Sequence, residues 1–390
     1  SEYRYRQDSD VYYLSGWRDP DVAVLLRPGH EQPFTLFVQP RNPAVEMWTG
    51  RRPGPEGAMA EFGADWALDI DELPIQLPAL VQGYANLHYR LGEDQDRDRL
   101  VVGALSKARR QAKKNGLVYP DAFIDPARVL HELRLFKSEA EIQRLRVAAE
   151  ITSDAHCEAM RMTRGGVFEY QLEACIERVF RARGGEGPGY TTIVGGGNNA
   201  TVLHYSANRE VLAEGTLVCV DAGCEFDFYT ADLTRTWPVS GTYSPAQRAL
   251  YEVVLDAQLK AIDCVRPGNT FHSVHEMATR VLTEGLVDLG LLEGDVDTLI
   301  ADGAQKRWYP HGTGHWLGLD VHDVGAYYQS GESRFLEPGM VLTVEPGIYV
   351  PSDAEDAPRE FRGIGIRIED DVLVTDGDPD VLTSGAPKLP

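Results

Sequence analysis

The stretch GIGIRIEDDVLV, residues 363–374, decides the fold that we expect for the C-terminal half of the chain. Side chains alternate between the two faces of a strand, so the isoleucines at every second position share one face, and Arg367 and Glu369 share the other. A carboxylate at the end of a buried strand costs several kcal/mol unless a cation or hydrogen bonds compensate it. The stretch therefore predicts a buried strand that ends at Glu369, with Arg367 placed to orient the carboxylates.

Four other stretches interrupt an apolar or glycine-flanked run with a polar side chain of the kind that binds metals. They are LVCVDAG (217–223), FYTADLTRTW (228–237), HGTGHWLGLDVHD (311–323) and VLTVEPGIYV (341–350), and the side chains are Asp221, Asp232, His315 and Glu345. An antiparallel hairpin brings the two aspartates to one face, and Glu345 and Glu369 belong to a second pair of strands. Five such positions together predict a metal site.

The types of these side chains indicate the metal. Carboxylates with one imidazole suit hard or borderline divalent ions such as Mn²⁺, Co²⁺, Zn²⁺ or Fe²⁺, and disfavour thiophilic ions. Four carboxylates carry more negative charge than one divalent ion neutralises. Two ions about 3.5 to 4 Å apart, bridged by two carboxylates and a water, balance that charge and leave a hydroxide nucleophile. The pattern predicts a hydrolase site.

Length, composition and charge exclude several classes of protein. The 390 residues favour two or three domains, and 43% hydrophobic with 25% charged residues is typical of a soluble globular protein. No apolar run is long enough to span a bilayer, and the start SEYRYRQDSD lacks signal-peptide character, so we expect a cytoplasmic protein without a membrane partner. The net charge of −22 argues against nucleic-acid binding. Five cysteines without a CxxC pair indicate reduced core residues.

The elements that we expect divide the chain near residue 130. The first part alternates short strands and helices and has no cluster of ligand-type side chains, which predicts an α/β domain over 1–130. Ser138 and Glu141 form a capping box that opens a long helix. The second part, 131–390, is expected to hold an antiparallel sheet covered by helices, an α+β plan, with helices at 139–162, 168–183, 245–264 and 271–289 and strand pairs at 215–238 and 339–374.

With their flanking residues, the five ligand-bearing stretches resemble the signature segments of the pita-bread metallopeptidases of family M24, and among these the aminopeptidase P group. The resemblance covers nearly the whole chain, including VEMWTGRR (45–52) and HELRLFKSEAEI (131–142). It implies a C-terminal pita-bread domain after a smaller creatinase/prolidase-like domain. The family pattern begins with about one more strand and helix, so we expect the N-terminal domain to be incomplete at its start.

The resemblance also implies roles for the five ligand-type residues. Asp221 would chelate one metal, Asp232 and Glu369 would bridge both metals, and His315 and Glu345 would complete the other. Glu345 is the candidate for the group that accepts the proton of the attacking water.

Further residues match other active-site positions of the family. His204 and His322 would touch the substrate and stabilise the tetrahedral intermediate, and His311 and Arg367 match catalytic positions. The candidates for substrate binding and the proline pocket are Tyr190, Val321, His311 and Tyr349. The remaining histidines have no such setting and are expected to be structural or solvent-facing; they are His88, His131, His156, His272 and His275.

The function that the resemblance implies is removal of the N-terminal residue from peptides with proline in second place, by attack of a metal-bridging hydroxide. Its cofactor would be two divalent ions, with Mn²⁺ favoured over Zn²⁺ and Co²⁺, and its partners a peptide substrate and copies of itself in a homodimer or homotetramer. Two alternatives stay open. A prolidase would use the same ligands but accept only Xaa-Pro dipeptides, and a pita-bread domain can also be a metal-free binding module.

Overall fold

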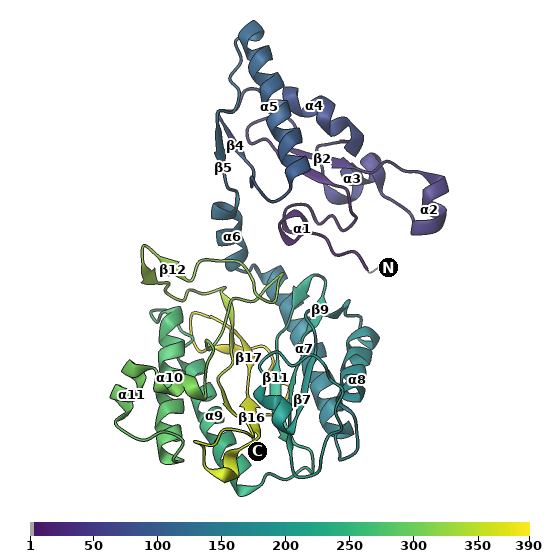
Figure 1. The fold of residues 1–390 in the computed structure, drawn as a ribbon. Coiled ribbons are helices and arrows are strands. Elements are labelled where there is room, and N and C mark those ends of the chain that lie inside the picture. The colour runs from purple at the N-terminus through teal and green to yellow at the C-terminus, as the bar shows by residue number, and fades with distance from the viewer. Residues whose placement is uncertain (1–3) are drawn as a thin grey trace. The chain divides into compact units, whose positions relative to one another are not determined.

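The computed structural model describes residues 4–390, and the chain divides into two compact units, Ser1–Leu130 and His131–Pro390 (Figure 1). The helix α6 (Ala127–Leu135) crosses the boundary between them. None of the described helices combines the length and the apolar character that a bilayer span needs.

The first unit is a small α/β domain. Its strand β2 (Phe34–Val38) lies in the middle of a three-stranded sheet, antiparallel to β1 (Ala23–Leu26) and parallel to β3 (Trp66–Asp69). A separate parallel pair is formed by β4 (Asn86–His88) and β5 (Ala122–Ile124). The helices are α1 (Ser9–Ser15), α2 (Pro43–Thr49), α3 (Gly54–Phe62), α4 (Leu73–Leu80) and α5 (Gln95–Asn115).

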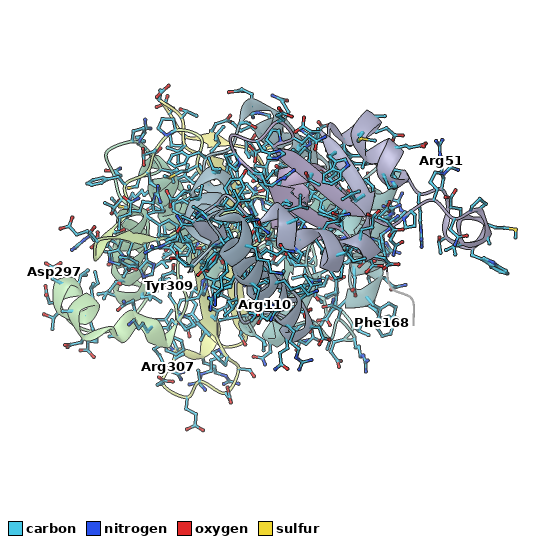
Figure 2. All side chains as sticks on the ribbon, turned by 90° about the horizontal axis from the view of Figure 1, so that it is seen from above. Arg51, Arg110, Phe168, Asp297, Arg307 and Tyr309 are labelled. Atoms are coloured by element: carbon cyan, nitrogen blue, oxygen red, sulfur yellow. The ribbon has the colours of Figure 1, made fainter. Side chains whose placement is uncertain are left out.

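The second unit carries all the predicted site residues. Its helices are α7 (Glu139–Met162), α8 (Glu169–Ala182), α9 (Pro245–Asp263), α10 (Phe271–Asp288) and α11 (Val296–Asp302). Its strands are β6 (Gly187–Pro188), β7 (Ile193–Gly196), β8 (Leu217–Asp221), β9 (Cys224–Phe226), β10 (Tyr229–Thr230), β11 (Thr234–Pro238), β12 (Tyr328–Gln329), β13 (Glu332–Ser333), β14 (Val341–Val344), β15 (Gly347–Val350), β16 (Ile364–Arg367), β17 (Asp370–Leu373) and β18 (Asp380–Val381). Charged side chains such as Asp297 of α11 and Arg307 point outward from this unit (Figure 2).

The strands of the second unit pair antiparallel, and two groups of them carry the site, besides the smaller sheets β10-β9-β6 and β12-β13. One group has the order β11-β8-β7, and in the other β14 pairs with β17 and β15 with β16. In Figure 1 the helices α7 and α8 lie on one side of these strands, and α9 and α10 lie on the other. The structure thus confirms the expected plan of an antiparallel sheet covered by helices.

Apolar packing explains why each helix pair lies where it does. Buried side chains of α7 and α8, such as Ile151 and Leu172, pack with Val218 and Val220 of β8. The alternate isoleucines of the stretch 363–374 pack with α9 and α10, as their common face predicts. The four predicted helices of this unit are confirmed to within one residue at either end.

The prediction of a strand that ends at Glu369 was wrong in one respect, because the strand is interrupted before that residue. The strand β16 ends at Arg367 and β17 starts at Asp370. The backbone N–H of Glu369 donates to the carbonyl oxygen of Thr234 at 3.1 Å, so this residue changes its pairing partner from one strand group to the other. The break brings the Glu369 backbone against the first group of strands.

Candidate metal centre and active site

Four of the five predicted ligands lie where strands begin, end or break. Asp221 is the last residue of β8, Asp232 lies just before β11, Glu345 follows β14, and Glu369 precedes β17. The polar residues therefore interrupt the apolar pattern at the positions where strands meet loops or breaks.

The fifth ligand, His315, lies on a loop that is fixed to β14. Its backbone N–H donates to the Thr343 hydroxyl at 3.1 Å, and its carbonyl oxygen accepts from the Thr343 N–H at 2.9 Å. The Glu345 N–H donates to the carbonyl oxygen of Thr313 at 2.7 Å. These bonds set His315 beside Glu345.

Two glycines allow the close approaches that build the site. A Cβ at Gly314 would lie 1.9 Å from the carbonyl oxygen of Thr343, so only glycine lets the His315 loop lie against β14. A Cβ at Gly223 would lie 1.7 Å from the carbonyl oxygen of Ala231, where the chain returns toward Asp232. Both positions demand glycine for space, although neither has a positive φ.

The ligand atoms converge. Asp232, His315 and Glu369 each offer one ligand atom, and these atoms all lie within 4.8 Å of one another. His315 Nε2 lies 3.3 Å from Asp232 Oδ2 and 3.8 Å from Glu345 Oε1. Asp221 joins them through Tyr190, whose hydroxyl lies 2.6 Å from Asp221 Oδ1 and 2.5 Å from Asp232 Oδ1.

The four carboxylates of Asp221, Asp232, Glu345 and Glu369, here called the acidic cluster, have too few positive charges near them to balance their own charge. Burial raises the pKa of Glu369 well above its usual range, and the charges of Asp232 and Glu345 raise it further. Burial also raises the pKa of Asp221, against the opposing charge of Arg367. The pKa of Glu345 rises to about 7, chiefly through burial and against the charge of His315. Without a cation the cluster therefore takes up protons.

The geometry of the donors fits divalent ions. One phenolic proton on Tyr190 cannot serve two carboxylates at hydrogen-bond distance, so Asp221 and Asp232 need further compensation. Burial lowers the pKa of His315, but the hydrogen bond and charge of Asp232 outweigh this and raise it to about 9. A proton on His315 thus does what a metal ion would do in its place. Carboxylate oxygens and one imidazole suit Mn²⁺, Co²⁺ or Zn²⁺.

A chain of hydrogen bonds links Arg367 to His311. Arg367 Nη2 donates to Asp221 Oδ2 at 2.7 Å, and Nη1 donates to the Tyr349 hydroxyl at 3.1 Å. His311 Nε2 lies 2.8 Å from the same hydroxyl, and its Nδ1 lies 2.7 Å from the carbonyl oxygen of Gly312. Burial and the charge of Arg367 lower the pKa of His311 to about 3. His311 is therefore neutral, with Nδ1 protonated and Nε2 accepting from Tyr349.

Of the other predicted residues, His322 lies against this cluster. The ring of His322 stands perpendicular to that of His315, with 4.4 Å between their centroids. Burial lowers the pKa of His322, and the charge of His315 lowers it further. His204 has a smaller lowering effect on the pKa values of both His322 and His311. His204 is exposed, and Val321 is half-buried next to His322. His311 also lines a cavity of about 230 Å³ with His275, Thr279, Gln305, Lys306, Tyr309, Pro310 and Gly312.

Two sequence profiles match the chain in consecutive parts. The profile of metallopeptidase family M24 matches residues 143–376, and that of the aminopeptidase P N-terminal domain matches residues 1–88. The Xaa-Pro aminopeptidase of Escherichia coli (strain K12) is 45% identical over 392 aligned residues, which cover 100% of this chain and 88% of the relative.

The chain belongs to metallopeptidase family M24.

Other M24 members agree in sequence and structure. Human Xaa-Pro aminopeptidase 3 is 36% identical, over 99% of this chain and 75% of its own length. The structure of Pseudomonas aeruginosa aminopeptidase PepP matches with a TM-score of 0.96 and 46% identity, over 99% of this chain and 88% of that one. A zinc-substituted Escherichia coli aminopeptidase P in complex with product matches with a TM-score of 0.95 and 44% identity, over 100% and 88%. The expected fold and metallopeptidase class are thereby confirmed.

Two residues that support the M24 site had not been predicted. The Thr234 hydroxyl donates to Glu369 Oε2 at 2.6 Å and accepts from Arg367 Nε at 3.1 Å. Both carboxylate oxygens of Asp371 lie 3.1–3.2 Å from the backbone N–H of Asp232, which donates to them. The available signal for Asp371 was a run of three acidic residues, 369–371, within an apolar strand pattern.

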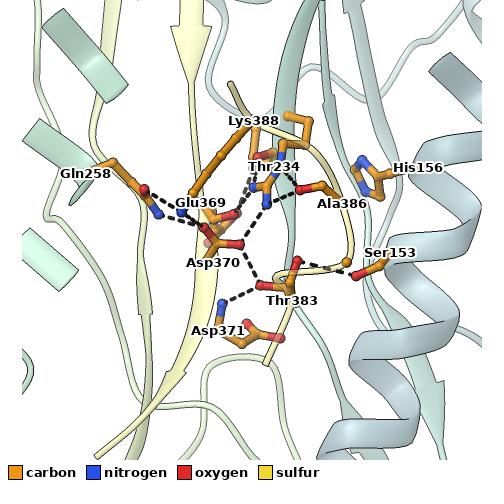
Figure 3. Close-up of polar contacts among 12 residues, drawn as sticks. Ser153, His156, Thr234, Gln258, Glu369, Asp370, Asp371, Thr383, Ala386 and Lys388 are labelled. Carbon is orange, nitrogen blue, oxygen red and sulfur yellow. Dashed lines mark hydrogen bonds and ion pairs between the residues drawn. The ribbon is translucent and has the colours of Figure 1, made fainter. Parts of the chain in front are cut away.

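A second ionic cluster surrounds Asp370, the residue that follows the predicted ligand Glu369 (Figure 3). Asp370 is fully buried and forms ion pairs with Arg235 Nη2 at 2.7 Å and Lys388 Nζ at 2.5 Å. Burial raises the pKa of Asp370, but the charges of Arg235 and Lys388 outweigh this and lower it. The Asp370 carboxylate is therefore charged.

Proposed function

We propose that the protein is a dinuclear-metal aminopeptidase that removes the N-terminal residue from peptides with proline in second place. The convergence of Asp232, His315 and Glu369 within 4.8 Å carries the proposal. The 45% identity to an Xaa-Pro aminopeptidase supports the choice of substrate. We propose that the two compact units are the N-terminal domain and the catalytic domain.

The ligand roles are also part of the proposal. Asp221 would hold one ion, Asp232 and Glu369 would bridge two, and His315 and Glu345 would hold the other. Such ions, when bound, would polarise the scissile carbonyl and lower the pKa of a water. Glu345 would accept the proton of that water, since its second oxygen, Oε2, lies 3.8 Å from His311 Nδ1 on the side of the active-site histidines.

The neighbouring side chains would bind and orient the peptide. His322 and His204 would donate hydrogen bonds to the oxygen of the tetrahedral intermediate, which stabilises charge that develops in the transition state. Arg367 would hold Asp221 in place through the 2.7 Å contact of its Nη2. The amino group of the substrate would lie near Asp221, which restricts cleavage to one residue at a time.

Selectivity for proline would come from a shaped pocket. The Xaa-Pro amide has no N–H, so recognition through that hydrogen is impossible and ring shape must decide. Tyr190, Val321 and His311 are the proposed wall of the pocket, with Tyr349 behind His311. Tyr190 and His311 are tied to the site by the contacts of their polar ends to Asp221 and Tyr349.

Metal identity and assembly are further proposals. Two divalent ions would balance the charge of four carboxylates in one site. The many oxygen ligands of that site favour Mn²⁺. A homodimer or homotetramer stays a prediction, as does a cytoplasmic location.

The decisive experiment compares two peptides. We expect the Mn²⁺-loaded protein to release the first residue from a Xaa-Pro-Xaa tripeptide, measured by mass spectrometry, with a matched Xaa-Ala-Xaa peptide cleaved far more slowly. Elemental analysis of the same sample should find two metal ions per chain. Glu345→Ala should abolish turnover, because it removes both a ligand and the proton acceptor.

The alternatives predict other outcomes. Hydrolysis of the Xaa-Pro dipeptide alone would show a prolidase and contradict the proposal. An intact fold with neither hydrolysis nor bound metal would indicate a binding module.

A further inference from the structure

Two consecutive aspartates, Asp370 and Asp371, lie directly behind the two proposed bridging ligands. Asp371 accepts the backbone N–H of Asp232, and Asp370 follows Glu369 in the chain. Both aspartates are buried, with at most 1% of their surface exposed. Any movement of this pair would therefore move the backbone of both Glu369 and Asp232.

Arg235 connects the aspartate pair to the other strand group. Its Nη2 donates to Asp370 Oδ1 at 2.7 Å, and its Nη1 donates to the carbonyl oxygens of Glu369 and of Thr234, the latter at 3.1 Å. Arg235 comes from β11, three residues after Asp232. One guanidinium thus holds the backbone of Glu369 beside the strand that follows Asp232.

The segment 383–388 closes this cluster from behind (Figure 3). The Thr383 hydroxyl donates to Asp370 Oδ1 at 2.7 Å, and the carbonyl oxygen of Ala386 accepts from Arg235 Nη2 at 3.0 Å. Lys388 Nζ contacts Asp370 Oδ2 at 2.5 Å and Gln258 Oε1 at 2.9 Å. The Lys388 carbonyl oxygen in turn accepts from the Tyr251 hydroxyl at 2.8 Å.

The charge balance makes Lys388 the sensitive member. Asp370 has two cationic partners, Arg235 and Lys388, and the guanidinium also serves three backbone carbonyls. If Lys388 loses its charge, Arg235 alone must neutralise the buried Asp370 carboxylate. Its hydrogen bonds to the carbonyl oxygens of Glu369 and Thr234 then compete with its ion pair to Asp370. The spacing of the two bridging ligands would then loosen.

We propose that Lys388 is a positioning residue of the metal centre: through Asp370 and Arg235 it holds Glu369 and Asp232 at the spacing that the ions require. The inference rests on the proposed function for the ligand roles. It goes beyond that function because it assigns part of the metal affinity to a segment that contributes no ligand.

The test measures metal binding rather than turnover. In the full-length metal-free protein, Lys388→Met keeps the aliphatic stem and removes the charge. We expect its dissociation constant for Mn²⁺, measured by isothermal titration calorimetry, to rise about tenfold, as for other groups that orient ligands from behind. The absorption spectrum of the Co²⁺-loaded variant should also change. Lys388→Arg keeps the charge and should restore the affinity.

A matched control separates positioning from general stability. Glu132→Gln weakens another ion pair of the same unit, in which buried Arg334 Nη1 lies 2.7 Å from Glu132 Oε1. This change should lower the unfolding temperature but leave the Mn²⁺ affinity unchanged. The inference is wrong if Lys388→Met binds Mn²⁺ like the wild type, or if Glu132→Gln weakens binding equally.

Two further outcomes are informative. If Lys388→Met does not fold, Gln258→Met removes the neutral donor that lies 2.8 Å from Asp370 Oδ2 and the oxygen that accepts from Lys388 Nζ. Weaker Mn²⁺ binding then supports the inference, and unchanged binding overturns it. Mn²⁺ binding without peptide cleavage by the wild type would contradict the proposed substrate and leave this inference standing. No Mn²⁺ binding by the wild type would overturn both the metal site and the inference.

Discussion

Arg367 contacts three parts of the site with its three nitrogens. Nε donates to the Thr234 hydroxyl at 3.1 Å, while Nη1 and Nη2 reach Tyr349 and Asp221. A lysine ammonium is a single point at the end of a flexible stem and cannot reproduce this fork. Arg367 therefore fixes the predicted ligand Asp221, Thr234 and Tyr349 relative to one another. Tyr349 in turn contacts His311.

This arrangement predicts the effect of Arg367→Lys. We expect kcat/KM for a Xaa-Pro-Xaa peptide to fall about 10- to 100-fold, with weaker Mn²⁺ binding, because Asp221 and Tyr349 lose a common donor. Steady-state kinetics at saturating Mn²⁺ measure the loss. Arg307→Lys is the control, since Arg307 pairs with Asp356 at an exposed surface and its variant should behave like the wild type. Equal kinetics for both variants would contradict the assigned role.

Single residues also show how far sequence reasoning reaches. Asp221, Asp232 and Glu369 could be recognised as candidate ligands because their carboxylates interrupt apolar runs. Thr234 and Lys388 were not, because their contacts to Glu369 and Asp370 join residues 135 and 18 positions apart, and no local pattern records such contacts. The roles of His204 and Val321 stay predictions.

The loop 311–323 is fixed at both ends by different means. Near its start it pairs with β14 through Thr313 and His315, and at its end Asp323 is held by buried cations. Asp323 Oδ1 accepts from Arg134 Nη2 at 2.6 Å, and Oδ2 accepts from Lys137 Nζ at 3.1 Å. The segment between these anchors carries Val321 and His322, and the His322 ring lies 4.4 Å from that of His315.

These anchors predict the effect of Asp323→Asn. The change leaves Lys137 without its buried counter-charge, and we expect the free energy of unfolding to fall by about 3 kcal/mol. KM for the tripeptide should rise, because His322 adjoins the altered residue. Urea unfolding and steady-state kinetics measure the two effects. The change Asp320→Asn affects a half-buried residue that contacts the same Arg134 at 2.8 Å but leaves the Lys137 pair intact, so it should cost less stability. Equal losses would show that Asp323 has no special role.

At the level of elements, periodicity predicted helices better than strands. The helices α7 and α9 begin where Glu141 and Gln247 reach back to the backbone N–H of Ser138 and Ser244, at 2.8 and 2.9 Å, and both caps are readable in sequence. The break between β16 and β17 was not predictable. It exists because Glu369 pairs with Thr234, and that partner is set by the tertiary fold rather than by neighbouring residues.

In the whole molecule, a buried histidine couples stability to pH. His156 is fully buried in α7, and its Nε2 lies 3.1 Å from the carbonyl oxygen of Ala222. Burial lowers its pKa from 6.5 to about 4. Because the unfolded chain binds a proton that the folded chain rejects, this residue destabilises the fold as pH falls from 6.5 toward 4.

The prediction is that His156→Gln reduces the acid sensitivity of the fold. Glutamine can still donate to the carbonyl oxygen of Ala222 but does not titrate. The variant should therefore not show the decrease of roughly 3 kcal/mol in the free energy of unfolding that His156 causes in the wild type between these pH values. Urea unfolding of the metal-free protein at several pH values gives the slopes. His272→Gln, at a half-exposed surface position, should keep the wild-type slope. Identical slopes for wild type and His156→Gln would contradict the prediction.

The position of the ligands at strand ends has a consequence for how the protein keeps its metal. Donors from Asp221 to Glu369 meet only after both strand groups and their helices have assembled, and the unfolded chain offers no comparable set. Ions that bind the folded chain alone raise its stability in proportion to the logarithm of their free concentration. The free metal concentration therefore sets part of the free energy of unfolding of this unit. A chelator should lower that free energy even when no peptide is present.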